Sequence, residues 1–148
     1  MYFKNLQPYR LSTEWPITAE SLHEQLARKP FHSCGSQDFE SRGWVAPCDG
    51  GELVHAIGDN WLVCMQTETK ILPPAVVQQE ADKRAKEIEE QQGFRLGRKQ
   101  MKELREQITQ ELLPRAFTRS RKTYAWINVA AGWLVIDAAS QSRAEDVL

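Results

Sequence analysis

Two stretches rich in apolar residues, each divided by a short turn, dominate the pattern of the chain. Residues 52–69 divide at Gly58-Asp59-Asn60, and residues 124–138 divide at Ala130-Ala131-Gly132. Glycine and asparagine tolerate the positive φ that tight turns need, so each stretch predicts a β-hairpin. The apolar residues of the second hairpin are nearly continuous, which predicts central strands covered on both faces.

The beginning of the chain predicts one strand and one helix. Residues 2–11 are rich in strand-forming types, and Pro8 favours an edge position because proline cannot donate to a ladder. A threonine then caps a helix over residues 18–29, in which Leu22 and Leu26 lie four apart and supply the buried stripe.

Segments rich in glycine, serine and aspartate follow this helix. Residues 31–51 predict a structured loop with a short strand near Trp44, and Cys34–Asp38 is typical of a tight turn whose polar side chains satisfy the backbone. At the other end of the chain, Ser140 or Ser142 caps the first turns of a helix. That helix stops before it buries a face, so we expect the chain to continue in a longer protein.

Between the two β-hairpins the apolar spacing changes to that of helices. Pro73 and Pro74 fit the first turn of one helix, and Gly93 and Gly97 precede a second helix over about residues 99–113. The apolar stripes of the two helices are Val77, Ala81, Ala85 and Ile88, and Met101, Leu104, Ile108 and Leu112. Facing stripes of this kind predict an antiparallel helical hairpin.

Together these elements predict an α+β fold. We expect a small antiparallel or mixed sheet, built from hairpins with flanking helices, and a projecting two-helix hairpin. Residues 1–72 and 123–148 are the predicted α+β core domain, and residues 73–122 are a predicted insertion that consists of the helical hairpin and a basic loop.

Composition narrows the class of protein. The chain has 148 residues, 41% of them hydrophobic and 26% charged, as in soluble globular domains. No apolar run approaches the roughly 20 residues of a membrane helix, so we expect a cytoplasmic protein without a membrane partner. The three cysteines are Cys34, Cys48 and Cys64, an odd number at wide spacing, which predicts buried, reduced thiols.

The net charge of −1 conceals a strong asymmetry. Residues 93–122 carry a net charge of +6, which leaves −7 for the rest of the chain. The nine cations of this segment are Arg95, Arg98, Lys99, Lys102, Arg105, Arg115, Arg119, Arg121 and Lys122. A concentration of positive charge favours an anionic partner, and we expect these cations to share one accessible surface. The first helix, by contrast, pairs opposite charges four residues apart and neutralises itself.

The densest positive charge lies in residues 115–122, which contain four cations and no acid. We interpret them as a basic loop that neutralises successive phosphates, with Thr118 and Ser120 as hydroxyl donors, a mode without sequence preference. A solvated charged face is an equally weighted alternative. Phe117 is either a core residue beneath the hairpin or an exposed anchor for a second subunit.

Several short phrases of the sequence, taken together, resemble one known family. They are FKNL and YRLS near the start, CGSQD at 34–38, GWV at 43–45, KILP at 70–73, LLPRAF at 112–117 and AED at 144–146. Their order and spacing over almost the whole chain make it similar to the N-terminal part of the longer proteins of the recombination-associated RdgC family.

This resemblance implies a bacterial, nucleoid-associated protein that binds double-stranded DNA without sequence preference. It also implies that the protein restrains RecA-driven strand exchange by occupying DNA. Members of the family form a ring-shaped dimer around the duplex, and the position of Phe117 lies at one dimer contact. We therefore expect a homodimer with Phe117 at its interface and the nine cations as DNA-binding residues.

The sequence matches no common pattern of an enzyme site. The three histidines and three cysteines fit no zinc spacing, His23 is more simply a surface or satisfied histidine, and the glycines form no nucleotide-binding loop. We predict no enzyme activity, metal, cofactor or small-molecule substrate. The competing hypothesis is a protein-interaction module that docks a partner through Met101, Leu104 and Ile108 without binding DNA.

Overall fold

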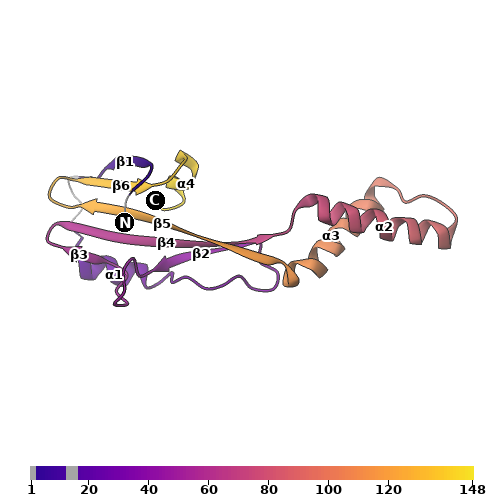
Figure 1. Ribbon diagram of the computed structural model, residues 1–148, viewed down its shortest axis with the longest axis horizontal. Coiled ribbons are helices and arrows are strands. Elements are labelled where there is room, and N and C mark those ends of the chain that lie inside the picture. Colours follow the sequence, from indigo (N-terminus) through magenta and orange to yellow (C-terminus); the bar gives the residue numbers. More distant parts are fainter. Residues whose placement is uncertain (1–2, 13–16) are drawn as a thin grey trace. The chain divides into compact units, whose positions relative to one another are not determined.

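A computed structural model describes residues 3–12 and 17–148 (Figure 1). The elements are β1 (Leu6–Arg10), α1 (Ala19–Leu26), β2 (Glu40–Val45), β3 (His55–Ile57), β4 (Asn60–Ile71), α2 (Pro74–Gln92), α3 (Arg98–Leu112), the 3-10 turn η1 (Leu113–Arg115), β5 (Phe117–Asn128), β6 (Trp133–Asp137) and α4 (Gln141–Glu145). The strands form one open sheet in the order β1-β6-β5-β4-β2, with β3 paired to β4. The predicted α+β class is confirmed.

The chain divides into two compact units. The sheet unit takes in residues 1–32, 41–67 and 120–148, and the helical unit takes in residues 33–40 and 68–119. Strands β4 and β5 each contribute residues to both units. The helical unit therefore contains the segment 33–40 in addition to α2 and α3.

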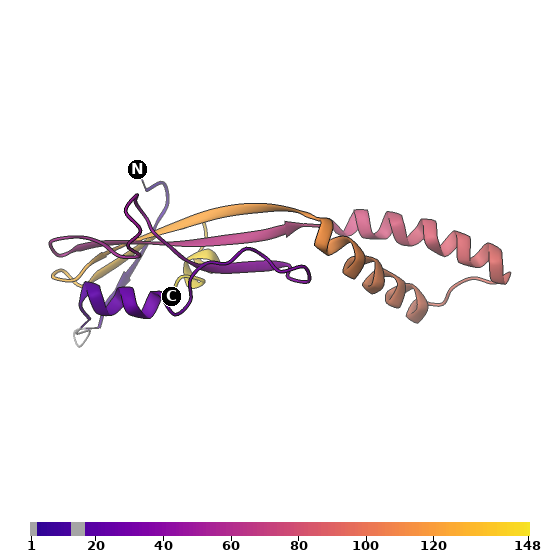
Figure 2. The ribbon, with the colours of Figure 1, turned by 90° about the horizontal axis from the view of Figure 1, so that it is seen from below.

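The core of the sheet unit lies between one face of the sheet and helices α1 and α4, which Figure 2 shows on the same side of the strands. Leu22 and Leu26 are the buried residues of α1, as predicted. Thr18 caps this helix, because its Oγ1 accepts a hydrogen bond from the amide of Ser21 at 3.1 Å. The helix ends at Leu26, earlier than the predicted residue 29.

Both predicted β-hairpins are confirmed. Ile57 pairs with Asn60 around a turn in which Gly58 has a φ of 60°, and Asn128 pairs with Trp133. The prediction that the second hairpin is covered on both faces is wrong. Its side chains alternate, so the face that carries Trp126 and Trp133 points away from the core and stays half-exposed.

The N-terminal strand is an edge strand, as Pro8 predicts. Strand β1 pairs only with β6, with Leu6 opposite Asp137 and Arg10 opposite Trp133. The predicted strand began at Tyr2, which lies outside the described residues. The short strand expected near Trp44 is the longer β2.

Helix α4 corrects one expectation about the end of the sequence. Ser140 is its cap, since its Oγ accepts from the amide of Arg143 at 3.3 Å. The helix buries a face despite its five residues, because Ala144 is fully buried and Val147 packs against the same core. A short helix can contribute to a core when the sheet supplies the rest of the apolar surface.

In the helical unit, α2 and α3 run antiparallel and side by side (Figure 1 and Figure 2). Pro74 occupies the first turn of α2, and Gly93 ends this helix with a φ of 80°. The shared apolar cluster contains Val77, Ala81, Ala85, Leu104 and Ile108, with Met101 and Leu112 packed against it. The predicted hairpin of helices is confirmed.

This packing contradicts the competing hypothesis of a docking face on the second helix. Ile108 is 0% exposed and Leu104 is buried, because both pack against α2. The face that would have bound a partner is the contact between the two helices.

The predicted basic loop is also wrong. Arg115 belongs to η1, and residues 117–122 form the exposed first half of β5. The exposure of these side chains explains the error. They are exposed on both faces of the strand, so they lack the alternation of apolar and polar residues by which a strand is recognised in a sequence.

Candidate nucleic-acid interface

Helix α3 presents a line of three positive side chains. Arg98, Lys102 and Arg105 are spaced by four and three residues, so they lie on one face of the helix beside the apolar stripe. At 1.5 Å per residue, the line is about 10 Å long. Lys99 lies about a quarter turn away around the same helix, and Arg95 lies in the turn that precedes it.

Within the described residues, none of the nine candidate cations forms an ion pair with an acidic side chain. Glu111, an acid of the same helix, is paired with a residue outside this set. Arg84 of α2 bonds Glu111 through Nη1 at 2.7 Å and Glu80 through Nε at 3.1 Å. These two carboxylates raise the pKa of the Arg84 guanidinium, with Glu111 the larger cause. The cations of α3 therefore keep their charge available.

The cations of β5 divide between two faces. Successive side chains of a strand point to opposite sides, so Arg121 and Lys122 cannot contact the same surface. The two structural units also divide the set, because Arg121 and Lys122 belong to the sheet unit and the other seven belong to the helical unit. The expectation that all nine share one surface is therefore wrong for this pair.

Phe117 is 84% exposed at the start of β5. This exposure removes the core alternative for Phe117 and leaves the anchor alternative. An exposed phenyl ring of this kind suits an interface better than solvent, because it leaves most of a large apolar surface in water.

Sequence reasoning missed a groove in the helical unit. The groove has a volume of about 550 Å³ and lies between α3, the start of α2 and the exposed ring of Phe39. Leu72, Pro74 and Val77 line it, together with the stem of Arg105. No local signal could have found it, because Phe39 comes from a loop that is distant in sequence from both helices.

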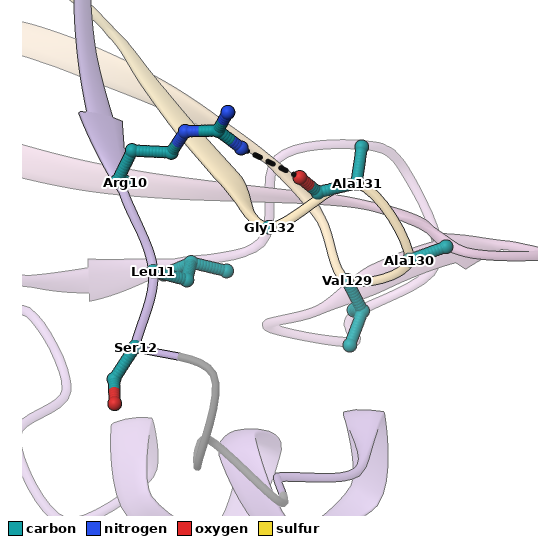
Figure 3. A pocket seen from close by; sticks show the side chains of 7 residues that line it. All are labelled: Arg10, Leu11, Ser12, Val129, Ala130, Ala131 and Gly132. Carbon is teal, nitrogen blue, oxygen red and sulfur yellow. Dashed lines mark hydrogen bonds between the residues drawn. The ribbon is translucent and has the colours of Figure 1, made fainter.

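Sequence reasoning also missed Arg10 in the sheet unit. Its Cζ lies 4.1 Å from the centroid of the Trp133 ring, and its Nη1 donates to the carbonyl of Ala131 at 3.1 Å. Figure 3 shows this hydrogen bond beside a pocket of about 400 Å³ between the end of β1 and the β5–β6 turn. Only the register of β1 against β6 reveals this arrangement.

The cysteines and histidines follow the predictions in part. All three cysteines are free, but only Cys64 is buried, while Cys48 is exposed and Cys34 is half-buried. His23 is a satisfied histidine, since its Nδ1 accepts from the amide of Leu53 at 3.2 Å. The tight turn after Cys34 is confirmed, because the amide of Gly35 donates to Asp38 Oδ2 at 2.8 Å.

Comparison with known proteins identifies the family. The family model described as "Putative exonuclease, RdgC" matches residues 1–148. The chain belongs to the RdgC family. The "Recombination-associated protein RdgC" of Dechloromonas aromatica is 49% identical over 148 residues, and that of Herminiimonas arsenicoxydans is 51% identical over 148 residues. In each case the match covers 100% of this chain and 49% of the relative.

This RdgC chain spans about half the length of the curated relatives it matches. The same holds for the relative from Burkholderia cenocepacia, which is 50% identical over 147 residues and is covered over 48% of its length. The names of these relatives place the family in recombination.

The family description names an exonuclease, whereas the names of the relatives do not. Within residues 3–12 and 17–148, no group of three or more His, Cys, Asp or Glu side chains is placed to hold a metal ion. The same part of this RdgC chain contains no helix of the length and apolarity required to cross a bilayer.

Proposed function

We propose that this chain binds double-stranded DNA without sequence preference. The observation that carries the proposal is the line of Arg98, Lys102 and Arg105 on α3, which makes no ion pair with any described residue. Lysine and arginine that contact phosphates release condensed counterions, and this term is independent of base sequence.

The exposed half of β5 supports the same partner chemistry. Arg119 and Arg121 share one face of the strand, and Thr118 and Ser120, whose hydroxyls can donate to phosphate oxygens, share the opposite face with Lys122. A strand rises about 3.3 Å per residue, so alternate side chains lie about 7 Å apart. This distance is of the same order as the separation between successive phosphates of one DNA strand. That separation combines an axial rise of about 3.4 Å with a sideways displacement around the helix axis.

In the cell, a protein that binds DNA in this way acts as a nucleoid-associated protein of the bacterial cytoplasm. Occupation of the duplex restrains RecA-driven strand exchange, because the bound segment is closed to a recombination filament. The functional form is a homodimer that encircles the duplex as a ring, with Phe117 at one contact. The protein acts by binding DNA and not by catalysing a reaction.

The test of DNA binding is a charge reversal. Arg98, Lys102 and Arg105, all changed to Glu, are expected to abolish binding of a labelled random-sequence duplex while leaving the circular dichroism spectrum intact. The matched control reverses Lys83, Lys86 and Arg28, which changes the net charge by the same amount on helix α2 and beside α1. Unchanged gel-shift affinity in the first triple variant would remove the proposal.

A salt series tests the mechanism, and it also addresses the exonuclease description. The logarithm of the binding constant is expected to fall linearly with that of the salt concentration, with a slope of about −0.9 per phosphate contact. A binding surface of apolar side chains would respond only weakly. The duplex is expected to stay intact during incubation with Mg²⁺, and its degradation, if absent with a mock preparation, would contradict a purely binding role.

A further inference from the structure

The sheet unit carries an arginine that is held in place on the face turned away from α1 and α4, hereafter the outer face. Leu134 and Ile136 of β6 belong to the core with those helices, so Trp133 points to the outer face. Arg10 lies directly opposite Trp133 in the register, and its neighbour Tyr9 packs on the core side. Arg10 therefore shares the outer face with Trp133.

Two contacts fix the guanidinium of Arg10. Its Cζ lies over the indole ring of Trp133, 4.1 Å from the centroid. Its Nη1 donates to the carbonyl of Ala131 at 3.1 Å (Figure 3). A guanidinium has five N–H donors at its edge. The stacking contact uses its plane and the hydrogen bond uses one donor, so the remaining donors can form a fork on an oxyanion.

The charge of Arg10 is not balanced within the described residues. Arg10 is exposed and forms no ion pair there. The acid of the same strand pair on the outer face, Asp137, lies opposite Leu6 at the other end of β1. Its Oδ1 accepts from the amides of Lys4 and Asn5, at 3.2 and 2.9 Å.

We propose that Arg10 is a phosphate-binding residue and that duplex DNA contacts the outer face of the sheet. The inference rests on the proposed DNA-binding function. Because stacking on Trp133 already orders the side chain, a phosphate that reaches Arg10 does not have to immobilise a free arginine. Lys122 lies on the same face, since Lys122, Tyr124 and Trp126 are every second residue of β5 and Trp126 pairs with Val135, which shares the face of Trp133.

A purely structural role for Arg10 makes different predictions. If the guanidinium served only to cover Trp133, its loss would lower the stability of the sheet and leave the salt dependence of DNA binding unchanged. The slope of binding against salt counts phosphate contacts, so it separates the two roles.

The experiment measures binding of this chain to a fluorescent random-sequence duplex by anisotropy, from 50 to 300 mM NaCl. Arg10→Gln is expected to make the log-log slope less steep by about 0.9 and to weaken binding about 3- to 10-fold near 100 mM NaCl. Arg10→Lys is expected to keep the slope and lose affinity, because it retains the charge without the planar fork. Arg143→Gln is the control, since it removes one exposed charge from α4, which packs on the other face.

A Trp133→Leu variant tests the role of stacking. It is expected to weaken binding with little change in slope, and to remove most of the difference between Arg10 and Lys at position 10. Arg10→Gln and Arg143→Gln with equal slopes would overturn the inference. If the wild-type chain bound no duplex, or if the triple reversal in α3 had no effect, the proposed function itself would fail.

Discussion

At the residue scale, burial changes the chemistry of one cysteine. Cys64 is 1% exposed, and its burial raises the pKa of the thiol from 9.0 to about 11. The charge of Lys122 and a hydrogen bond with Tyr124 act in the opposite direction and do not cancel this effect. The folded state therefore holds the thiol proton at a pH where the unfolded chain releases it.

This shift predicts a loss of stability in alkali. A raised folded-state pKa gives stability that is complete below pH 9 and is lost as the pH rises toward about 11. A shift of this size corresponds to about 2 to 3 kcal/mol of unfolding free energy. Urea unfolding of Cys64→Ala is expected to show a flatter decline from pH 8.5 to 11 than the wild type.

The exposed Cys48 provides the control for this measurement, since Cys48→Ala is expected to keep the wild-type decline. The pKa of Tyr124 is also raised by burial, so part of the decline is expected to remain in Cys64→Ala. Identical pH profiles for the wild type and Cys64→Ala would contradict the assignment.

At the scale of the element, α3 is charged against its own dipole. Arg98 and Lys99 occupy the first turn, where acidic side chains stabilise a helix, and Glu111 occupies the last turn, where basic side chains do so. Arg98 and Lys102 are also like charges four residues apart, which adds repulsion. This arrangement costs helix stability, and the proposed binding of DNA at the basic end would account for it.

This arrangement predicts that stability and DNA affinity move in opposite directions. Arg98→Glu is expected to raise the unfolding free energy by about 0.5 to 1 kcal/mol at low salt, because it places an acid in the first turn and opposite Lys102. The same variant is expected to weaken duplex binding. Arg98→Gln is the neutral control and is expected to fall between the two in both measurements. A variant that loses stability together with affinity would count against this account.

At the scale of the whole molecule, the proposed dimer depends on exposed apolar surface. Phe117 is the most exposed large apolar residue among those described, and Phe94 in the turn between α2 and α3 is 61% exposed. Neither residue contributes to a core cluster. Substitution of either is therefore expected to leave the fold of the protomer intact, so changes in assembly can be read directly.

Phe117→Ala is expected to weaken self-association at least tenfold, as is typical of a central aromatic anchor of an interface. Sedimentation velocity over a range of protein concentrations measures the effect. Phe94→Ala, a matched loss of one exposed ring, is expected to retain the wild-type assembly. The same oligomer at the same concentration for wild type and Phe117→Ala would exclude the proposed contact.

The elements that could be predicted from sequence are those with local causes. The N-cap of Thr18, the proline start of α2 and the glycine turn at Gly58 each depend on groups a few residues apart. The apolar stripe of α3 likewise follows from helical spacing alone. The sequence also concentrates positive charge in residues 93–122, whatever the fold.

Tertiary structure alone decided which of these features are exposed and which of them share a face. It made residues 117–122 a strand, so that Arg121 and Lys122 point to opposite faces. It also placed Arg10 on Trp133, and it buried Ile108 between two helices. These outcomes depend on contacts between residues far apart in the chain, whose pairing is set by strand register and by the packing of apolar faces, and no local pattern specifies either.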